Sequence, residues 1–256
     1  MYVWLFAAGL GASIFGSMVG LGGGFVIVPV LRLFFGLNPA AASGTSLALV
    51  VANSASGSLA YMLQRRVHVR VGLLLSAAAF PASILGAIAV KRLPSNWYDL
   101  LFAAFITAIA IDILRSSGRR LERRHDAAAV DGLAGMRWPI AVAAGFAVGL
   151  ISSLFGVGGG VVLIPSLLYL SVLPAHAITA TSQFAILLTS PVGLAAHYAQ
   201  HDIDWNYVVP LVAGGLIGGP VGARLSLRVR SPRLMKFIAG ALIAAAAALV
   251  SRHVFG

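Results

Sequence analysis

The fold is decided by a glycine-rich stretch that occurs twice, as Gly20-Leu-Gly-Gly-Gly24 and as Gly156-Val-Gly-Gly-Gly160. The same offset along the chain pairs further small and polar residues without a gap: Ser17 with Ser153, Thr45-Ser46 with Thr181-Ser182, Pro29 with Pro165, Ser54 with Ser190, and Gly86-Ala87 with Gly222-Ala223. The chain is therefore one half-molecule built twice. A duplicated apolar unit that Gly and Pro interrupt is typical of secondary transporters.

The composition indicates a membrane protein. Of 256 residues, 59% are hydrophobic and only 10% are charged, whereas a soluble domain carries about 25% charged residues. The chain has no cysteine, which excludes disulfides and thiolate metal sites. Its net charge of +11 does not indicate nucleic-acid binding, because the basic residues gather in three short loops between apolar segments.

Five apolar segments in each half are long enough to suggest membrane helices, since a lipid-exposed backbone must satisfy its own hydrogen bonds. We expect them at 3–19, 24–37, 40–64, 71–90 and 97–114, and at 138–155, 160–173, 176–200, 206–226 and 234–251. The sequence thus predicts an all-α integral membrane protein with about ten transmembrane segments. Its parts are a first repeat (1–114), a basic linker (115–137) and a second repeat (138–256). The apolar N-terminus is interpreted as a retained first span.

The basic loops predict the topology. Arginines and one lysine are concentrated at 65–70, in the linker and at 224–236, and five crossings per half would put these three regions on one side. The positive-inside rule makes that side cytoplasmic and places both termini outside. An odd number of crossings makes the two repeats inverted. We favour this over a rival in which re-entrant Gly-rich segments leave four crossings per half and parallel repeats, although segment 24–37 is short for a full span.

The glycine runs have two interpretations that stay open. They could let helices pack closely, or they could break the helix so that the next segment begins with free N–H groups that attract an anion. The glycines proposed for the second role are Gly22, Gly23, Gly24, Gly158, Gly159 and Gly160.

Polar residues follow the third segment of each half. The candidates for substrate contact are Thr45, Ser46, Asn53 and Ser54 in the first half, and Thr181, Ser182, Gln183, Thr189 and Ser190 in the second. Asn53 and Thr189 are repeat partners near the middle of their segments, so inverted repeats would place both near the bilayer midplane, where such transporters bind substrate. A single Ser or Thr more often bonds back to its own helix. For the paired positions Asn53-Ser54 and Thr189-Ser190 we instead favour substrate contact.

Charged residues inside the apolar segments are few, which favours a small anion over a cation as the substrate. Asp112 is expected to pair with Arg115 at the cytoplasmic rim, and Asp99 is expected at the membrane interface. For Arg32 we favour snorkelling to the outer surface over attracting anions. The histidines have no metal-ligand spacing, and we predict no metal, no cofactor and no catalytic residues.

The doubled motif, Gly20 to Leu31 with Ala41–Ser46 and Gly156 to Leu167 with Ala177–Ser182, resembles the TauE/SafE sulfite exporter family of membrane permeases. The resemblance implies export of sulfite, sulfoacetate or related organosulfonates. We therefore expect a permease of the bacterial inner membrane that exports small sulfur oxyanions by alternating access. The alternatives are a transporter of a metal cation or a proton-coupled organic acid, and a non-transporting membrane protein. A homodimer is possible on sequence grounds, through the small-residue faces of 72–90 and 211–223.

Overall fold

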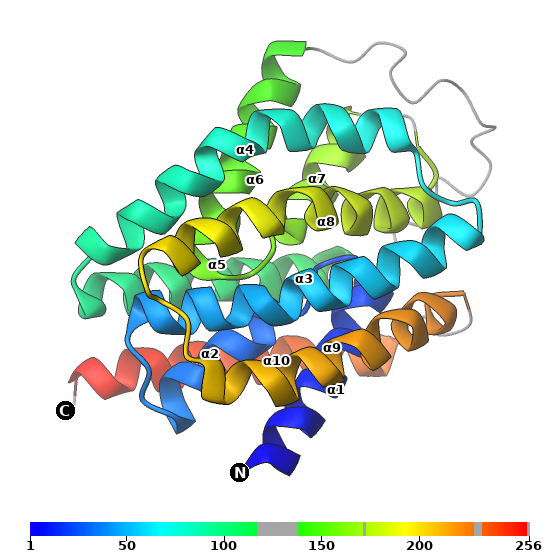
Figure 1. Cartoon of the computed structure of the whole chain (residues 1–256). Coiled ribbons are helices and arrows are strands. Elements are labelled where there is room, and N and C mark those ends of the chain that lie inside the picture. Colours follow the sequence, from blue (N-terminus) through cyan, green and yellow to red (C-terminus); the bar gives the residue numbers. More distant parts are fainter. Residues whose placement is uncertain (117–137, 171–172, 228–231, 255–256) are drawn as a thin grey trace.

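The computed structural model describes residues 1–116, 138–170, 173–227 and 232–254, and the prediction of an all-helical fold is confirmed (Figure 1). The described part holds ten α-helices. In the first half they are α1 (Tyr2–Val19), α2 (Gly24–Phe34), α3 (Pro39–Leu63), α4 (Val69–Arg92) and α5 (Ser95–Ser116). In the second half they are α6 (Trp138–Phe155), α7 (Gly160–Leu170), α8 (Ala175–Ala199), α9 (Trp205–Leu225) and α10 (Pro232–Val254).

Helix lengths correspond between the halves. The first three helices have 18, 11 and 25 residues, and so do α6, α7 and α8. Five helices are long and apolar enough to cross a membrane, namely α1, α3, α4, α8 and α9. The predicted linker falls almost entirely at 117–137, outside the described residues, and so do the side chains of Asp112 and Arg115.

Helices α2 and α7 are too short to span a bilayer by themselves. Eleven residues extend about 16 Å, and the hydrocarbon core is about 30 Å thick. Each follows a glycine turn that brings the chain back against the preceding helix: Gly23 packs on Ala12 and Gly16 of α1, and Gly159 packs on Val148 and Ser152 of α6. We call α1–α2 and α6–α7, with their turns, the first and second hairpin.

The turns need glycine because their backbones are left-handed. Gly20, Gly22 and Gly23 have φ of 88°, 86° and 86°, and Gly156, Gly158 and Gly159 have φ of 68°, 84° and 74°. Side chains with a Cβ rarely adopt these angles. This explains why the glycine run is repeated in both halves.

Helices from different halves pack against each other. Helix α1 lies along α9, α6 lies along α4, and α3 and α8 occupy the middle with α9 and α4 beside them (Figure 1). Small residues permit the close approach: Gly218 and Gly222 of α9 touch the backbone of α1, and Gly149 of α6 touches the backbone of α4. The small-residue faces named for a homodimer thus form contacts within one subunit.

The two central helices run antiparallel. Thr45, near the start of α3, accepts a hydrogen bond from the backbone N–H of Asp204, just after α8 has ended. Thr181, near the start of α8, accepts one from the backbone N–H of His68, just after α3 has ended. Each distance is 3.1 Å. The start of each helix therefore lies beside the end of the other.

Loops that the charge pattern assigned to one side do meet at one end of the bundle. Arg66 donates to Ser226 Oγ and to the carbonyl oxygen of His176. At the opposite end, Lys91 pairs with Asp202 at 3.1 Å. We name these the Arg66 end and the Lys91 end. In the predicted topology the Arg66 end is cytoplasmic and the Lys91 end is outside.

One prediction about a charged residue is wrong. Arg32 does not snorkel to the surface, because it is buried and forms an ion pair with Asp99, which is buried near the start of α5. Arg32 Nε donates to Asp99 Oδ1 at 2.8 Å, and Nη1 donates to the carbonyl oxygen of Leu37. A buried guanidinium needs such partners, since an uncompensated charge there would be costly.

Candidate functional site

The two glycine turns meet at the centre of the bundle. A Cβ at Gly24 would clash with the carbonyl of Gly156, and a Cβ at Gly160 would clash with the carbonyl of Gly20. The contact is thus reciprocal, backbone on backbone. It places the first turns of α2 and α7 in one region, where their N-terminal N–H groups and helix dipoles favour negative charge.

The serine of each Thr-Ser pair forms a hydrogen bond to one of the two turns. Ser46 donates to the carbonyl oxygen of Gly156 at 2.9 Å, and Ser182 donates to that of Gly20 at 2.8 Å. The neighbouring threonines hold the start of α9 and of α4, as described above. Both pairs are fully buried. Ser46 and Ser182 therefore bond to the hairpin turns, whereas Thr45 and Thr181 bond to the backbone just before α9 and α4.

A polar cluster lies beside the first turn, formed by Ser17, Asn53, Gln183 and the carbonyl of Gly22. Asn53 Nδ2 donates to Gly22 O at 2.9 Å, and Asn53 Oδ1 accepts from Ser17 Oγ at 2.8 Å. Gln183 Nε2 donates to Ser17 Oγ at 3.0 Å. All three side chains are buried, and Gln183 Oε1 has no hydrogen-bond partner in the described part of the chain. We call this group the Asn53 cluster.

The second half lacks an equivalent cluster. The partners of Ser17, Asn53 and Gln183 are Ser153, Thr189 and Leu47. Thr189 Oγ1 bonds back to Ala185 O at 3.0 Å, and Ser153 Oγ has no hydrogen-bond partner among the described residues. The centre is therefore polar on the side of the first hairpin and more apolar on the other.

The predicted site residues thus separate into two groups. The structure brings together the glycines of both turns, Ser46, Ser182, Asn53 and Gln183, whereas Thr45 and Thr181 bond to the backbone of Asp204 and His68. It does not bring in Ser54, Thr189 or Ser190, whose hydroxyls bond to Val51, Ala185 and Ile186 of their own helices. For these three residues the geometry matches the general habit of Ser and Thr in helices.

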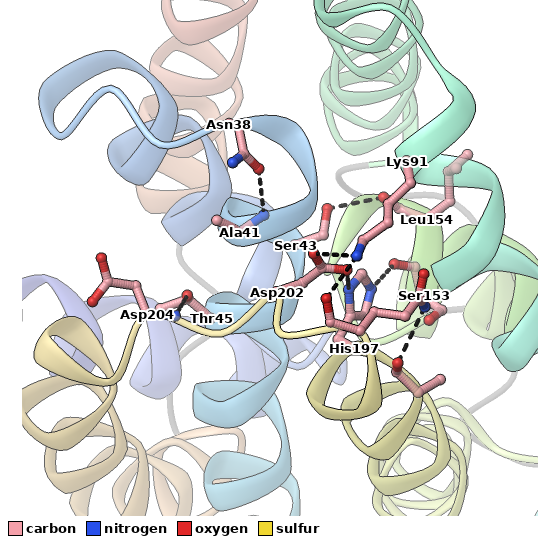
Figure 2. Close-up of polar contacts among 12 residues, drawn as sticks. Asn38, Ala41, Ser43, Thr45, Lys91, Ser153, Leu154, His197, Asp202 and Asp204 are labelled. Carbon is pink, nitrogen blue, oxygen red and sulfur yellow. Dashed lines mark hydrogen bonds and ion pairs between the residues drawn. The ribbon is translucent and has the colours of Figure 1, made fainter.

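Sequence reasoning missed a second polar group, at the Lys91 end (Figure 2). His197 and Asp202 are buried there, His197 Nε2 lies 2.9 Å from the carbonyl oxygen of Ser153, and Lys91 donates to Gln200 O. The repeat offset is the signal that could have drawn attention to it, because the offset pairs His197 with Tyr61 and Ser153 with Ser17. The two pairs make equivalent contacts: Tyr61 bonds to the carbonyl oxygen of Ser17, and His197 to that of Ser153.

Chemically, the centre offers neutral donors and helix N-termini. Among the described residues, no group of three or more His, Asp or Glu side chains could hold a metal ion. The turns are packed so closely that a solute could pass only if the hairpins moved apart.

Comparison with known proteins agrees with this geometry. Residues 5–249 match the family described as Sulfite exporter TauE/SafE. The chain belongs to this family. The family resemblance inferred from the doubled motif is therefore confirmed, and the chain is a probable membrane transporter.

Curated relatives support the same class over nearly the whole length. The chain is 30% identical to the probable membrane transporter protein YunE of Bacillus subtilis over 99% of both chains. It is 26% identical to a probable membrane transporter protein of Xylella fastidiosa, over 91% of this chain and 88% of the relative. It is 27% identical to the probable membrane transporter protein MJ0441 of Methanocaldococcus jannaschii, over 82% and 77%. No solved structure matches the chain.

Proposed function

We propose that this TauE/SafE protein is a permease of the bacterial inner membrane that exports small anions, sulfite or an organosulfonate, by alternating access. The observation that carries the proposal is the reciprocal contact of the two glycine turns, which directs the N-termini of α2 and α7 at one central region. Helix N-termini with neutral amide and hydroxyl donors suit a sulfur oxyanion. Ser46 and Ser182 bond to the meeting turns themselves, and the Asn53 cluster adds side chains that bond to Gly22 of the first turn.

The repeats are proposed to be inverted. The antiparallel α3 and α8, the matching helix lengths and the reciprocal bonds of the Thr-Ser pairs all support this. The proposal keeps an odd number of crossings in each half, which places the linker on the cytoplasmic side.

Transport requires the hairpins to separate at one end at a time. Opening at the Arg66 end would admit the anion to the Asn53 cluster, and opening at the Lys91 end would release it. Movement of one repeat against the other around a fixed central site is the usual mechanism for transporters built from inverted repeats. The membrane potential suffices as the driving force, since 100 mV favours exit of one negative charge by about 2.3 kcal/mol.

The proposal is tested by exchange of radiolabelled sulfite and of a small organosulfonate across proteoliposomes that contain the full chain. We expect exchange of at least one of them above protein-free vesicles. Asn53→Ala should slow it about tenfold or more, because two buried hydrogen bonds of the cluster are lost. Exchange of a divalent cation in place of both anions would overturn the proposal in favour of a cation transporter.

Ser54→Ala is the matched control, since Ser54 adjoins Asn53 but bonds only within α3. Its exchange rate should stay within about twofold of wild type. If Ser54→Ala and Asn53→Ala slow exchange equally, the Asn53 cluster is not the binding region.

A further inference from the structure

One ring nitrogen of His197, Nδ1, has no hydrogen-bond partner among the described residues unless it carries an additional proton. His197 is fully buried near the end of α8, and its Nε2 lies 2.9 Å from the carbonyl oxygen of Ser153. A carbonyl oxygen only accepts hydrogen bonds, so Nε2 must carry the hydrogen. In a neutral imidazole the other nitrogen, Nδ1, is then a bare acceptor.

That bare nitrogen faces another acceptor. Nδ1 lies 3.5 Å from Oδ2 of Asp202, and neither atom has a hydrogen-bond partner among the described residues. An ionised carboxylate has no hydrogen to give, so two buried lone pairs oppose each other. One proton on Nδ1 would turn this contact into a charge-assisted hydrogen bond and satisfy both atoms.

Figure 2 shows the groups around the pair, among them Lys91 and Ser153. Lys91 at the end of α4 holds Asp202 Oδ1 at 3.1 Å, and its side chain is 40% exposed. The contacts from α3 and α6 are uncharged: the backbone of Gly44 packs on His197 and on the carbonyl of Asp202, and Ser153 presents its carbonyl. His201 adjoins Asp202 and is exposed. A proton can therefore enter from the Lys91 end.

The first half makes the equivalent bond without a group that titrates near neutral pH. Tyr61, the repeat partner of His197, donates to the carbonyl of Ser17 at 2.7 Å. Arg66, the partner of Asp202, lies over the Tyr61 ring, 5.0 Å from its centroid. Tyrosine titrates near pH 10 and histidine near pH 6.5. Of these two equivalent donors, only His197 belongs to a residue type that titrates near neutral pH.

We propose that His197 and Asp202 form a proton-binding site at the Lys91 end of the molecule. The bound proton sits on Nδ1 of His197 and is shared with Asp202. The proton links Asp202, in the loop between α8 and α9, to His197 near the end of α8. The ring of His197 also bonds to the carbonyl oxygen of Ser153 in α6. Proton loss leaves the two acceptors opposed and loosens this end.

The consequence for transport rests on the proposed function. If the Lys91 end is the outer gate, protons outside the cell favour its closed state and slow anion release. External pH then regulates export, and the proton need not travel with the substrate.

The site itself is tested without any substrate. Imidazole nitrogen signals of the full chain in detergent are followed by NMR between about pH 9 and pH 5, and His197→Gln identifies the signal of His197. We expect Nε2 to stay protonated throughout and Nδ1 to gain a proton as the pH falls. Asp202→Asn should weaken proton binding by roughly tenfold or more. A bare Nδ1 down to pH 5, or an unchanged midpoint in Asp202→Asn, would overturn the proposal.

The regulatory consequence has a separate test, exchange of a small organosulfonate against external pH, because a sulfonate stays ionised over this range. Wild type should slow as the external pH falls, and His197→Gln, whose amide can still donate to Ser153, should give a flat profile. His201→Asn is the control and should keep the wild-type profile. Identical profiles in wild type and His197→Gln would refute the regulation, whereas absence of exchange at every pH would refute the proposed function and leave the NMR result standing.

Discussion

Ser46 and Ser182 make equivalent bonds in the two halves, and each bond crosses from one half to the other. Their hydroxyls satisfy the carbonyls of Gly156 and Gly20, which the left-handed turns leave without helical partners. A buried carbonyl without a donor costs about 1 to 3 kcal/mol. These two serines therefore stabilise the meeting of the turns.

We predict that Ser46→Ala and Ser182→Ala each lower the free energy of unfolding by about 1 to 3 kcal/mol, because each leaves a buried carbonyl unsatisfied. Thermal unfolding in detergent measures the effect. Ser190→Ala is the control and should change stability less, since its hydroxyl bonds only to Ile186 of its own helix. Equal losses in all three variants would contradict the assigned bonds.

Sequence reasoning found the residues of the centre more readily than their partners. The offset between the halves exposed the Thr-Ser pairs and Asn53, because a repeated polar residue in an apolar segment is visible in one dimension. It did not reveal that Arg32 pairs with Asp99, or that Ser17 and Gln183 complete the Asn53 cluster. These contacts join residues far apart in the chain and depend on how the helices pack.

At the scale of the element, most helix bounds agree with the predicted apolar segments to within about two residues, because hydrophobicity and turn residues mark them. Three segments differ by three residues at one end, namely 24–37, 160–173 and 234–251. In the first of them α2 ends at Phe34, followed by Gly36 with φ 64°. Apolar residues continue past the helix end there, so composition alone placed the boundary too late.

Two glycines of α1 allow the effect of close packing to be distinguished from the effect of helix propensity. A Cβ at Gly16 would clash with the backbone of Gly22 and Gly23, whereas a Cβ at Gly11 meets nothing within 4 Å. We predict that Gly16→Ala destabilises the protein by about 1 to 3 kcal/mol or more through overpacking. Gly11→Ala should leave it unchanged or stabilise it by up to about 1 kcal/mol. Melting temperatures in detergent compare the two, and a tolerated Gly16→Ala would refute the hairpin geometry.

At the scale of the whole molecule, two similar halves enclose a centre that is not symmetric. The sequence predicts a duplication and, from the basic loops, an inversion, which stays a prediction. The polar first half and more apolar second half at the centre emerged only from the contacts, whereas the repeat offset by itself pairs Tyr61 with His197 at the ends. The two ends can therefore respond differently to the same solution.

The proposed topology is tested by labelling single cysteines, which the cysteine-free chain permits without background. A membrane-impermeant maleimide should label Tyr2→Cys and Ser251→Cys in intact spheroplasts. It should label Ser117→Cys, in the linker, only after the membrane is permeabilised. Labelling of the linker and both termini in intact spheroplasts would indicate parallel repeats, and labelling of the linker alone would reverse the orientation.

The most direct test of the central claim is net efflux of sulfite or a small organosulfonate from proteoliposomes with equal concentrations on both sides. We predict net efflux when the interior is held at about −100 mV, because the potential favours exit by about 2.3 kcal/mol per charge. At zero potential the net flux should vanish. Net efflux that persists unchanged at zero potential, or no flux of either anion at any potential, would contradict a potential-driven anion permease.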